Sequence, residues 1–403
     1  MPVRPSMSVV ERRNRIAIRH RLAPSWRTDD VAAIADGLVA LHSSDPATVY
    51  LSVAARMVNP SRGPVDTALY DRRSLIRHHA MRRTLWVATP EVARIMHAAA
   101  TVPIAARERN KLEQLLEANG IDNGAQWLRD ATAATLAAIG ERGPMTARML
   151  GPLVPSLRTP LVMSAGAAYS ATVAAHTRVL LVLGFDGEIV RTRPTGTWIN
   201  GEYRWAAMSD WIPEWLPGGM AGMSNQLAAG ELAARWLRAF GPAPASDLQW
   251  WTGWSGATTK AAITAAGAVE VHLDGVTGWV LADDIEPVEP PEPWVAVLPG
   301  LDPTTMGWKQ RDWFLSADMA SALFDRNGNG GPTIWVDGQV VGGWVQRKDG
   351  TLLPGFLAQV TKAQRRAIDA EFNRIRSTVG DTRFTVRFPA PLQIQLPADL
   401  SQA

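Results

Sequence analysis

The stretch Gly143–Leu150 reads GPMTARML, and the stretch Gly241–Leu248 reads GPAPASDL. In each, a helical pattern stops at Gly-Pro, and a Thr or Ser then stands where it would cap a short new helix. A third helical segment and an alternating, glycine-punctuated strand pair follow both stretches. This repeated order of elements is typical of a winged helix, and winged helices mostly bind nucleic acid. The repeat therefore favours a surface that follows nucleic acid over a small-molecule pocket.

Length and composition favour a globular protein of several modules. The chain has 403 residues, enough for three or four buried cores, and 46% of them are hydrophobic. Cysteine is absent, which excludes disulfides, zinc–thiolate sites and thiol nucleophiles. No apolar run reaches the roughly 18–20 residues of a membrane span, and the N-terminus lacks the apolar core of a secretion signal. We therefore expect a cytoplasmic protein without membrane contact.

The net charge of +3 says little, but the arginines are clustered. One cluster opposes a single acid, Glu11, and consists of Arg4, Arg12, Arg13, Arg15, Arg19, His20, Arg21 and Arg27. A second opposes only Asp71 and consists of Arg72, Arg73, Arg77, His78, His79, Arg82 and Arg83. Guanidinium groups pair with phosphate through two parallel hydrogen bonds, so both clusters are predicted to bind phosphate. The alternative is a solvated face in a chain that uses arginine for lysine, since only five lysines occur.

The predicted fold class is α+β, with three tandem winged helices and a small C-terminal β-barrel. The four modules are winged helix 1 over 1–102, winged helix 2 over 103–221, winged helix 3 over 222–286 and the barrel over 287–403. The Pro-rich segment Glu286–Pro293 marks the last boundary.

Hydrophobic periodicity and turn signals place the elements inside these modules. Helices are predicted at Val9–His20, Thr28–Leu41, Pro46–Met57, Arg107–Ala118, Gly124–Ile139, Leu161–Thr177 (the recognition helix of the second module), Asp247–Trp251, Thr258–Ala266 and Lys362–Val379. Strands are predicted at Arg83–Ala88, Val179–Leu183, Ile189–Thr195, Val269–Leu273, Gly278–Leu281, Trp294–Leu298, Thr333–Val336, Val340–Val345 and Phe384–Phe388.

The candidate site is the segment LHSSDP at 41–46, between two predicted helices. His42, Ser44 and Asp45 gather a possible base, a hydroxyl and a carboxylate at the start of a helix, where backbone N–H groups and a partial positive charge also lie. Such groups can orient a water molecule and stabilise positive charge, which suits hydrolysis of an N-glycosidic bond. On the alternative interpretation, Ser44 or Asp45 is only a helix cap and His42 an ordinary histidine.

Other chemistries lack a signal in the sequence. The seven histidines contain no pair at the i, i+4 spacing of a metal site, and no phosphate-binding glycine loop, dinucleotide turn or Gly-x-Ser-x-Gly elbow occurs. We therefore expect no metal and no nucleotide cofactor. Trp250, Trp251 and Trp254 stand in the third helix-turn-helix and could stack on an unpaired base, although most such residues belong to a core.

Several segments together resemble the bacterial winged-helix DNA glycosylases. The family's Leu-Gln-x-Gln or Leu-Gln-x-Asp segment corresponds to Leu41–Ser44, and its Met-Arg-Gly-Thr-Leu-His type of segment corresponds to Met81–Trp86. Further matches are Leu298–Pro303, Arg311–Trp313 and Val336–Gly342. Characterised members unhook bulky alkyl adducts and interstrand crosslinks, need no metal, and carry three winged helices and a C-terminal barrel, so the resemblance covers nearly the whole chain.

The resemblance implies a monofunctional DNA glycosylase that acts, without a cofactor, as a monomer on damaged double-stranded DNA. His42 and Ser44 replace the family's two catalytic positions, Gln and Gln or Asp, and Trp86 replaces a family histidine. On this hypothesis His42 orients or deprotonates water, with help from Ser44 and Asp45. The residues predicted to contact DNA are Arg12, Arg13, Arg77, Arg82, Arg83 and Trp86. The alternative is a DNA-binding relative, transcriptional or architectural, without catalysis.

Overall fold

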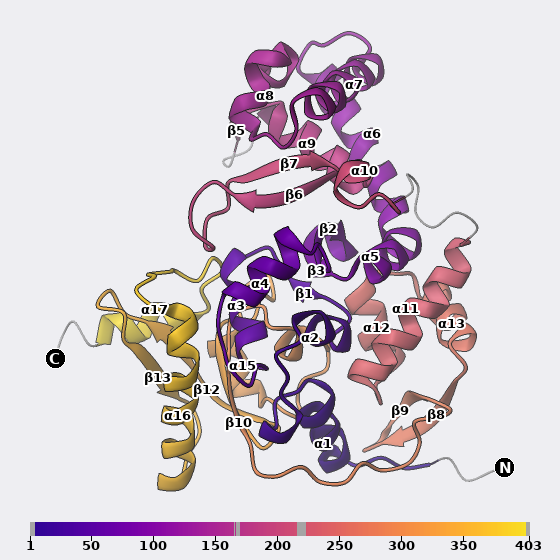
Figure 1. The fold of residues 1–403 in the computed structure, drawn as a ribbon. Helices are drawn as coiled ribbons and strands as arrows, with labels where there is room; N and C mark the ends of the chain where they lie inside the picture. The colour runs from indigo at the N-terminus through magenta and orange to yellow at the C-terminus, as the bar shows by residue number, and fades with distance from the viewer. Residues whose placement is uncertain (1–4, 165, 167–169, 216–222, 400–403) are drawn as a thin grey trace.

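The computed structural model describes residues 5–164, 166, 170–215 and 223–399. It is a mixed α+β protein in which the N-terminal module lies at the centre (Figure 1). Residues 102–211 stand above this module, the helices of 225–265 lie to its right, and the C-terminal sheet and its long helix lie at the lower left (Figure 1). Arg4, predicted to belong to the first basic cluster, lies outside the described residues.

The central module holds the candidate site segment. Its helices are α1 (Val9–Arg19), α2 (Val31–Gly37), α3 (Pro46–Ala54), α4 (Gly63–Asp66) and α5 (Pro90–Met96), with a π-helical turn at Thr67–Asp71 and 3₁₀ turns at Pro24–Trp26 and Met81–Arg83. Its strands are β1 (Leu41–His42), β2 (Ile76–Ala80) and β3 (Thr84–Ala88), which pair antiparallel in the order β1-β3-β2. The sequence predicted β3 but neither β1 nor β2.

The second module begins at a long helix that follows a π-helical turn, His97–Thr101. Its elements are α6 (Val102–Ala118), α7 (Gly124–Arg142), α8 (Ala147–Leu153), a 3₁₀ turn at Pro155–Arg158, β4 (Pro160–Met163), β5 (Ala171–Ala174), α9 (His176–Phe185), β6 (Ile189–Pro194), β7 (Tyr203–Ala207) and α10 (Met208–Trp211). As predicted, Thr146 caps the helix that follows Gly-Pro, because its side chain accepts a hydrogen bond from the Met149 N–H.

Two predictions for this module were wrong. In place of a recognition helix over 161–177 the structure has the antiparallel hairpin β4–β5, and in place of a strand at 179–183 it has α9. The apolar run Val179–Leu183 is too short for its period to separate a buried strand from a buried helix. Because α9 packs against both α6 and α7, most of its surface is buried, and its sequence shows no polar face that would mark it as a helix.

The third module follows the prediction closely. It consists of α11 (Asn225–Phe240), α12 (Ala245–Thr252), α13 (Gly256–Ala265), β8 (Ala268–Leu273) and β9 (Val276–Leu281). The β8–β9 hairpin turns at Asp274-Gly275, where both residues have positive φ. One detail differs from the prediction: the N-cap of α12 is Pro244, so no side chain caps this helix, and Ser246 lies inside it.

The C-terminal module is an open sheet. Strands β10 (Val295–Leu298), β11 (Thr333–Val336), β12 (Gln339–Gln346) and β13 (Leu352–Phe356) pair antiparallel in sequence order, and among the described residues no pairing of β13 with β10 closes a barrel. Helices α14 (Pro303–Met306), α15 (Ala317–Leu323), α16 (Lys362–Val379) and α17 (Pro391–Asp399) complete it. The predicted strand Phe384–Phe388 is irregular, because the N–H groups of Phe384 and Arg387 donate to the side chains of Gln346 and Asp45.

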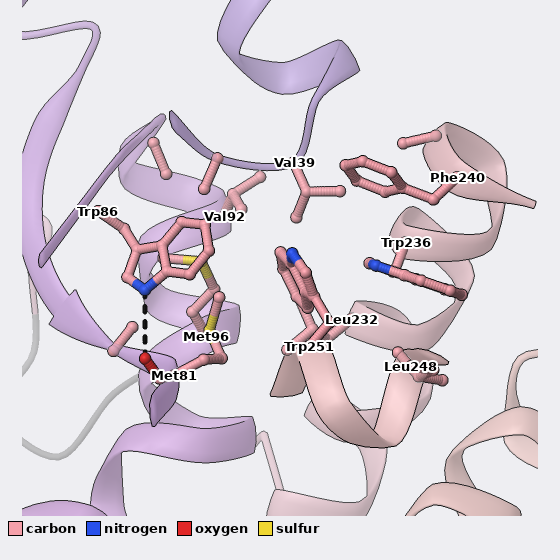
Figure 2. Packing of buried hydrophobic residues seen from close by; sticks show 14 of the residues in the cluster. Val39, Met81, Trp86, Val92, Met96, Leu232, Trp236, Phe240, Leu248 and Trp251 are labelled. Atoms are coloured by element: carbon pink, nitrogen blue, oxygen red, sulfur yellow. Dashed lines mark hydrogen bonds between the residues drawn. The ribbon is translucent and has the colours of Figure 1, made fainter. Parts of the chain in front are cut away.

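The modules share cores that cross their boundaries. Trp86 of β3 packs against Trp251 of α12, with ring centroids 5.4 Å apart, and Trp236 of α11 lies in the same cluster (Figure 2). A second cluster joins α3 to the C-terminal sheet and α16. The first, third and C-terminal modules are therefore held together by buried apolar surface, which fixes the surroundings of the candidate site.

Candidate functional site

The site segment leaves the sheet of the central module and starts α3. His42 is the last residue of β1 and pairs with Trp86 in the ladder, and Ser43 donates its N–H to the carbonyl of Leu85. Ser44 is half-buried, whereas His42, Ser43 and Asp45 are buried. Ser44 is thus the most accessible residue of the four.

His42 is held as a neutral imidazole. Only 3% of its surface is exposed, and its ring lies 3.9 Å from the ring of Trp86, centroid to centroid. Burial, and next the charge of Arg82, lower its pKa to about 3. Its Nε2 has no hydrogen-bond partner among the described residues. At neutral pH this side chain can therefore donate or accept a hydrogen bond, but it is a very weak base.

Asp45 has a structural role, because its carboxylate accepts hydrogen bonds from two backbone N–H groups. Its Oδ1 accepts from the Ala47 N–H at 3.0 Å, which caps α3, and its Oδ2 accepts from the Arg387 N–H at 3.1 Å. Burial raises the pKa of this carboxyl despite these two hydrogen bonds. The cap interpretation of Asp45 therefore describes its contacts in this structure, because each oxygen already accepts a hydrogen bond from a backbone N–H.

Arg77 lies beneath the segment instead of on a DNA-facing surface. It is 3% exposed; its Nε donates to Ser43 Oγ at 3.2 Å and its Nη1 to the Tyr70 hydroxyl at 2.8 Å. Its guanidinium also lies 4.9 Å from the ring centroid of Tyr203. In this structure the buried Arg77 supports the Ser43 side of the site segment, and its contact with DNA phosphate stays a prediction.

The two residues of α1 that were predicted to contact DNA both touch Trp313 of the C-terminal module; Arg12 is buried and Arg13 is half-buried. The guanidinium of Arg12 stacks 3.8 Å from the ring centroid of Trp313, and Arg12 is 7% exposed. Arg13 donates from Nε to the Trp313 carbonyl at 3.0 Å. Both arginines therefore tie α1 to the C-terminal module, and their contact with DNA stays a prediction.

Of the three residues of Met81–Trp86 that were predicted to contact DNA, Trp86 is buried, Arg82 is half-buried and Arg83 is exposed. Trp86 is 1% exposed and donates from Nε1 to the Met81 carbonyl at 3.3 Å, so it cannot contact DNA in this structure (Figure 2). Arg82 and Arg83 both adopt positive φ, 53° and 61°, which non-glycine residues rarely do. Arg83 has a side chain that is 61% exposed, and Arg82 lies 4.2 Å from the ring centroid of Trp250.

A residue that the site prediction missed completes this cluster. The guanidinium of Arg311 lies 5.2 Å from the ring centroid of Trp250, on which Arg82 also stacks, and burial lowers the pKa of Arg311 to about 10. The Nε atoms of Arg82 and Arg311 have no partner among the described residues. The Arg311–Trp313 segment was noted in the sequence, but nothing there could bring it to Arg82 across more than two hundred positions.

No three His, Cys, Asp or Glu side chains of the described residues come together as a metal site would require. None of the helices in the described part is long and apolar enough to span a bilayer.

Comparison with known proteins identifies the family of this chain. The family model for AlkZ-like DNA glycosylases matches residues 35–377, a range that includes the site segment, Met81–Trp86 and Arg311. The chain therefore belongs to this family, and the resemblance inferred from the sequence is confirmed. No curated protein matches the chain.

A solved structure supports the same conclusion at the level of the fold. The chain is similar to the DNA glycosylase AlkZ of Streptomyces sahachiroi, with a TM-score of 0.71 and 17% sequence identity. The similarity covers 95% of this chain and 99% of that one.

Proposed function

We propose that the protein is a monofunctional DNA glycosylase that hydrolyses the N-glycosidic bond of alkylated or crosslinked bases in double-stranded DNA. The observation that carries this proposal is the family match over residues 35–377, which includes the segment LHSSDP. We further propose that it acts as a monomer in the cytoplasm, without a metal or nucleotide cofactor.

Three tandem winged helices would supply the DNA-binding surface. The order α11-α12-α13 followed by the β8–β9 hairpin supports this interpretation for the third module. In the second module, α7, α8 and α9 followed by the β6–β7 hairpin support it, with β4–β5 inserted before α9. In the central module the β2–β3 hairpin follows α2, α3 and α4.

In the proposed reaction, the C–N bond breaks with its electron pair going to the base. The oxygen of a water molecule forms the new bond at the anomeric carbon and releases a proton to solvent. Ser44, the most accessible polar residue of the segment, would hold this water by a hydrogen bond, and His42 would act on it only as a neutral hydrogen-bonding group. Arg83 and Arg82 would bind DNA phosphates.

Such a site selects for a good leaving group. A purine alkylated on a ring nitrogen carries positive charge and leaves as a neutral base, so it needs no proton from an enzyme acid. The site segment fits this demand, because His42 with a pKa of about 3 cannot serve as an acid at neutral pH. Alkylated and crosslinked bases are therefore the proposed substrate class.

The test is base release from alkylated and from crosslinked duplex DNA by wild type, Ser44→Ala and His42→Ala, with binding to the same duplex measured alongside. We expect both variants to bind DNA as wild type does and to lose most base release. Base release by Ser44→Ala and His42→Ala at the wild-type rate would exclude both residues from the mechanism.

A second candidate function is DNA binding without catalysis. It is favoured by the hydrogen bonds that occupy both oxygens of Asp45 and by the burial of His42, which leave Ser44 as the accessible group of the segment. This candidate predicts salt-dependent duplex binding together with no base release by wild type on either substrate.

A further inference from the structure

A pocket of about 480 Å³ lies where three distant parts of the chain meet. One wall is the 3₁₀ turn Met81–Arg83, a second is the first half of α6, and the third is the turn between α12 and α13, residues 252–255. The pocket is therefore shared by the first, second and third modules, at the helix-turn-helix turn of the third.

Positive charge dominates the lining. It carries four cationic side chains, those of Arg82, Arg83, Arg107 and Lys111, and one acidic one, Glu108. Glu108 Oε1 accepts from Lys111 Nζ at 2.9 Å and from Arg83 Nη1 at 3.4 Å. Burial alone would raise the pKa of Glu108, but its contacts with Lys111 and Arg83 lower it overall, so it is ionised at neutral pH.

Two of the cations have no acidic partner. No carboxylate of the described residues forms an ion pair with Arg82 or with Arg107, whose Nε donates to the Pro103 carbonyl at 3.1 Å. Because one acid is shared by Arg83 and Lys111, the lining keeps a net positive charge. An unpaired guanidinium presents a planar row of donors that matches the oxygens of phosphate.

The opposite wall adds neutral donors on a fixed backbone. Ser255 caps α13, its hydroxyl lies 2.9 Å from that of Thr258, and both residues line the pocket. Gly253 ends α12 with φ of +76°, a conformation that a side chain would strain. Its α-carbon also borders Arg82, since an added β-carbon would lie 3.5 Å from Arg82 Cγ.

We propose that this pocket binds one phosphate group of the DNA backbone and thereby couples the second and third modules to the strand held at the first. This inference rests on the proposed function only in that the protein binds duplex DNA. The side chains of Arg83 and Lys111 are 61% and 58% exposed at the pocket rim. Because the pocket is open at this rim, it fits a phosphate that is part of a large molecule better than a free phosphate ion. The new contacts assigned are Arg107 and Lys111 of α6.

The test measures binding of undamaged duplex DNA by fluorescence anisotropy over a range of salt concentrations. Arg107→Ala and Lys111→Ala are each expected to weaken binding roughly 2- to 10-fold and to reduce the slope of log K against log salt by about 1. The matched control is Arg366→Ala, which removes the same charge from an exposed position on α16 and should leave affinity and slope unchanged.

The variant Glu108→Gln is expected to change the affinity for DNA in the opposite direction. Removing this acid frees Arg83 and Lys111 for phosphate, so duplex binding is expected to tighten roughly 2- to 10-fold and the salt slope to steepen. If the cluster only stabilised the fold, the same change would leave binding unaffected or weaken it. Thermal melts show whether each variant folds. If Glu108→Gln does not fold, the binding data for Arg107→Ala and Lys111→Ala test the proposal without it.

Separate outcomes identify the source of the phosphate. If wild type binds duplex DNA and both alanine variants bind it equally well, the pocket is refuted while the proposed function stands. If inorganic phosphate at constant ionic strength raises the melting temperature of wild type but not of Arg107→Ala, and DNA binding is the same in both, the pocket takes a free phosphate and the proposal is overturned. If wild type does not bind duplex DNA at all, both the pocket proposal and the proposed function are refuted.

Discussion

Removal of one partner from the ion pair between Arg56 and Asp302 is predicted to be among the most destabilising single changes, because both side chains are fully buried. The pair has two parallel hydrogen bonds: Arg56 Nη1 donates to Asp302 Oδ2 at 2.9 Å and Nη2 to Oδ1 at 2.8 Å. The remaining donors of Arg56 are used as well, with Nε donating to the His20 carbonyl at 2.9 Å. The pair joins the end of α3, whose start is the site segment, to the C-terminal module.

Asp302→Asn keeps the shape of the side chain but leaves a buried guanidinium without its counter-charge. Breaking a buried pair in this way costs about 3–5 kcal/mol, whereas replacing both partners by apolar residues is often close to neutral. We therefore expect Asp302→Asn to lower the free energy of unfolding by about 3–5 kcal/mol, and Arg56→Met/Asp302→Leu to lower it by less. Urea denaturation followed by tryptophan fluorescence measures both. A loss below about 1 kcal/mol in Asp302→Asn would refute the reasoning.

The pH dependence gives a second check on the same pair. Burial alone would raise the pKa of Asp302, but the charge and hydrogen bonds of Arg56 lower it below the usual range of an aspartate. A carboxyl whose folded-state pKa is lowered stabilises the fold above the unfolded-state pKa, and this contribution is lost as pH falls through the folded-state value. The difference between wild type and Asp302→Asn should therefore be constant from pH 5 to 8 and shrink below about pH 4.

Two further predictions concern charged residues outside the segment LHSSDP. Arg12→Ala should lower the melting temperature, because it removes the stack on Trp313, and should leave the salt dependence of DNA binding unchanged, whereas Arg83→Ala should reduce that slope by about 1; equal slopes would contradict the placement of Arg83. Burial raises the pKa of Asp247 to about 6, so its ionisation costs stability as pH rises from 3.8 to above 6. Asp247→Asn should therefore gain about 1–3 kcal/mol over wild type at pH 7.5 and nothing at pH 3.5, measured by urea denaturation; an equal gain at both pH values would rule out titration as the cause.

The sequence predicted best those elements whose boundaries depend on local chemistry. Thr146 caps α8 as predicted, because the capping hydrogen bond needs only a side-chain oxygen three residues before its donor. The β8–β9 hairpin also forms at its predicted turn, since Asp274-Gly275 supplies the positive φ values that a two-residue turn requires.

Elements that depend on tertiary partners could not be predicted in this way. β1 is only two residues long, and its extended backbone exists because β3 pairs with it. The segment Phe384–Phe388 has the alternation of a strand, but its N–H groups donate to side chains instead: Phe384 to Gln346 of the same module and Arg387 to Asp45 of the central module. The same holds for the first basic cluster: composition shows that arginines are numerous there, whereas their contacts with Trp313 and Asp284 arise only in the fold.

The candidate site shows how burial changes the chemistry that a residue type suggests. In the sequence, His42 is an attractive base and Asp45 an attractive carboxylate, but desolvation makes the first a very weak base and the helix cap occupies the second. What remains accessible is the hydroxyl of Ser44, which can position water but cannot take its proton at neutral pH. A glycosylase built in this way must depend on the leaving ability of its substrate, so its rate should rise with the positive charge of the damaged base. The pH profile of base release should then be flat from pH 6 to 8, because His42 does not titrate in that range.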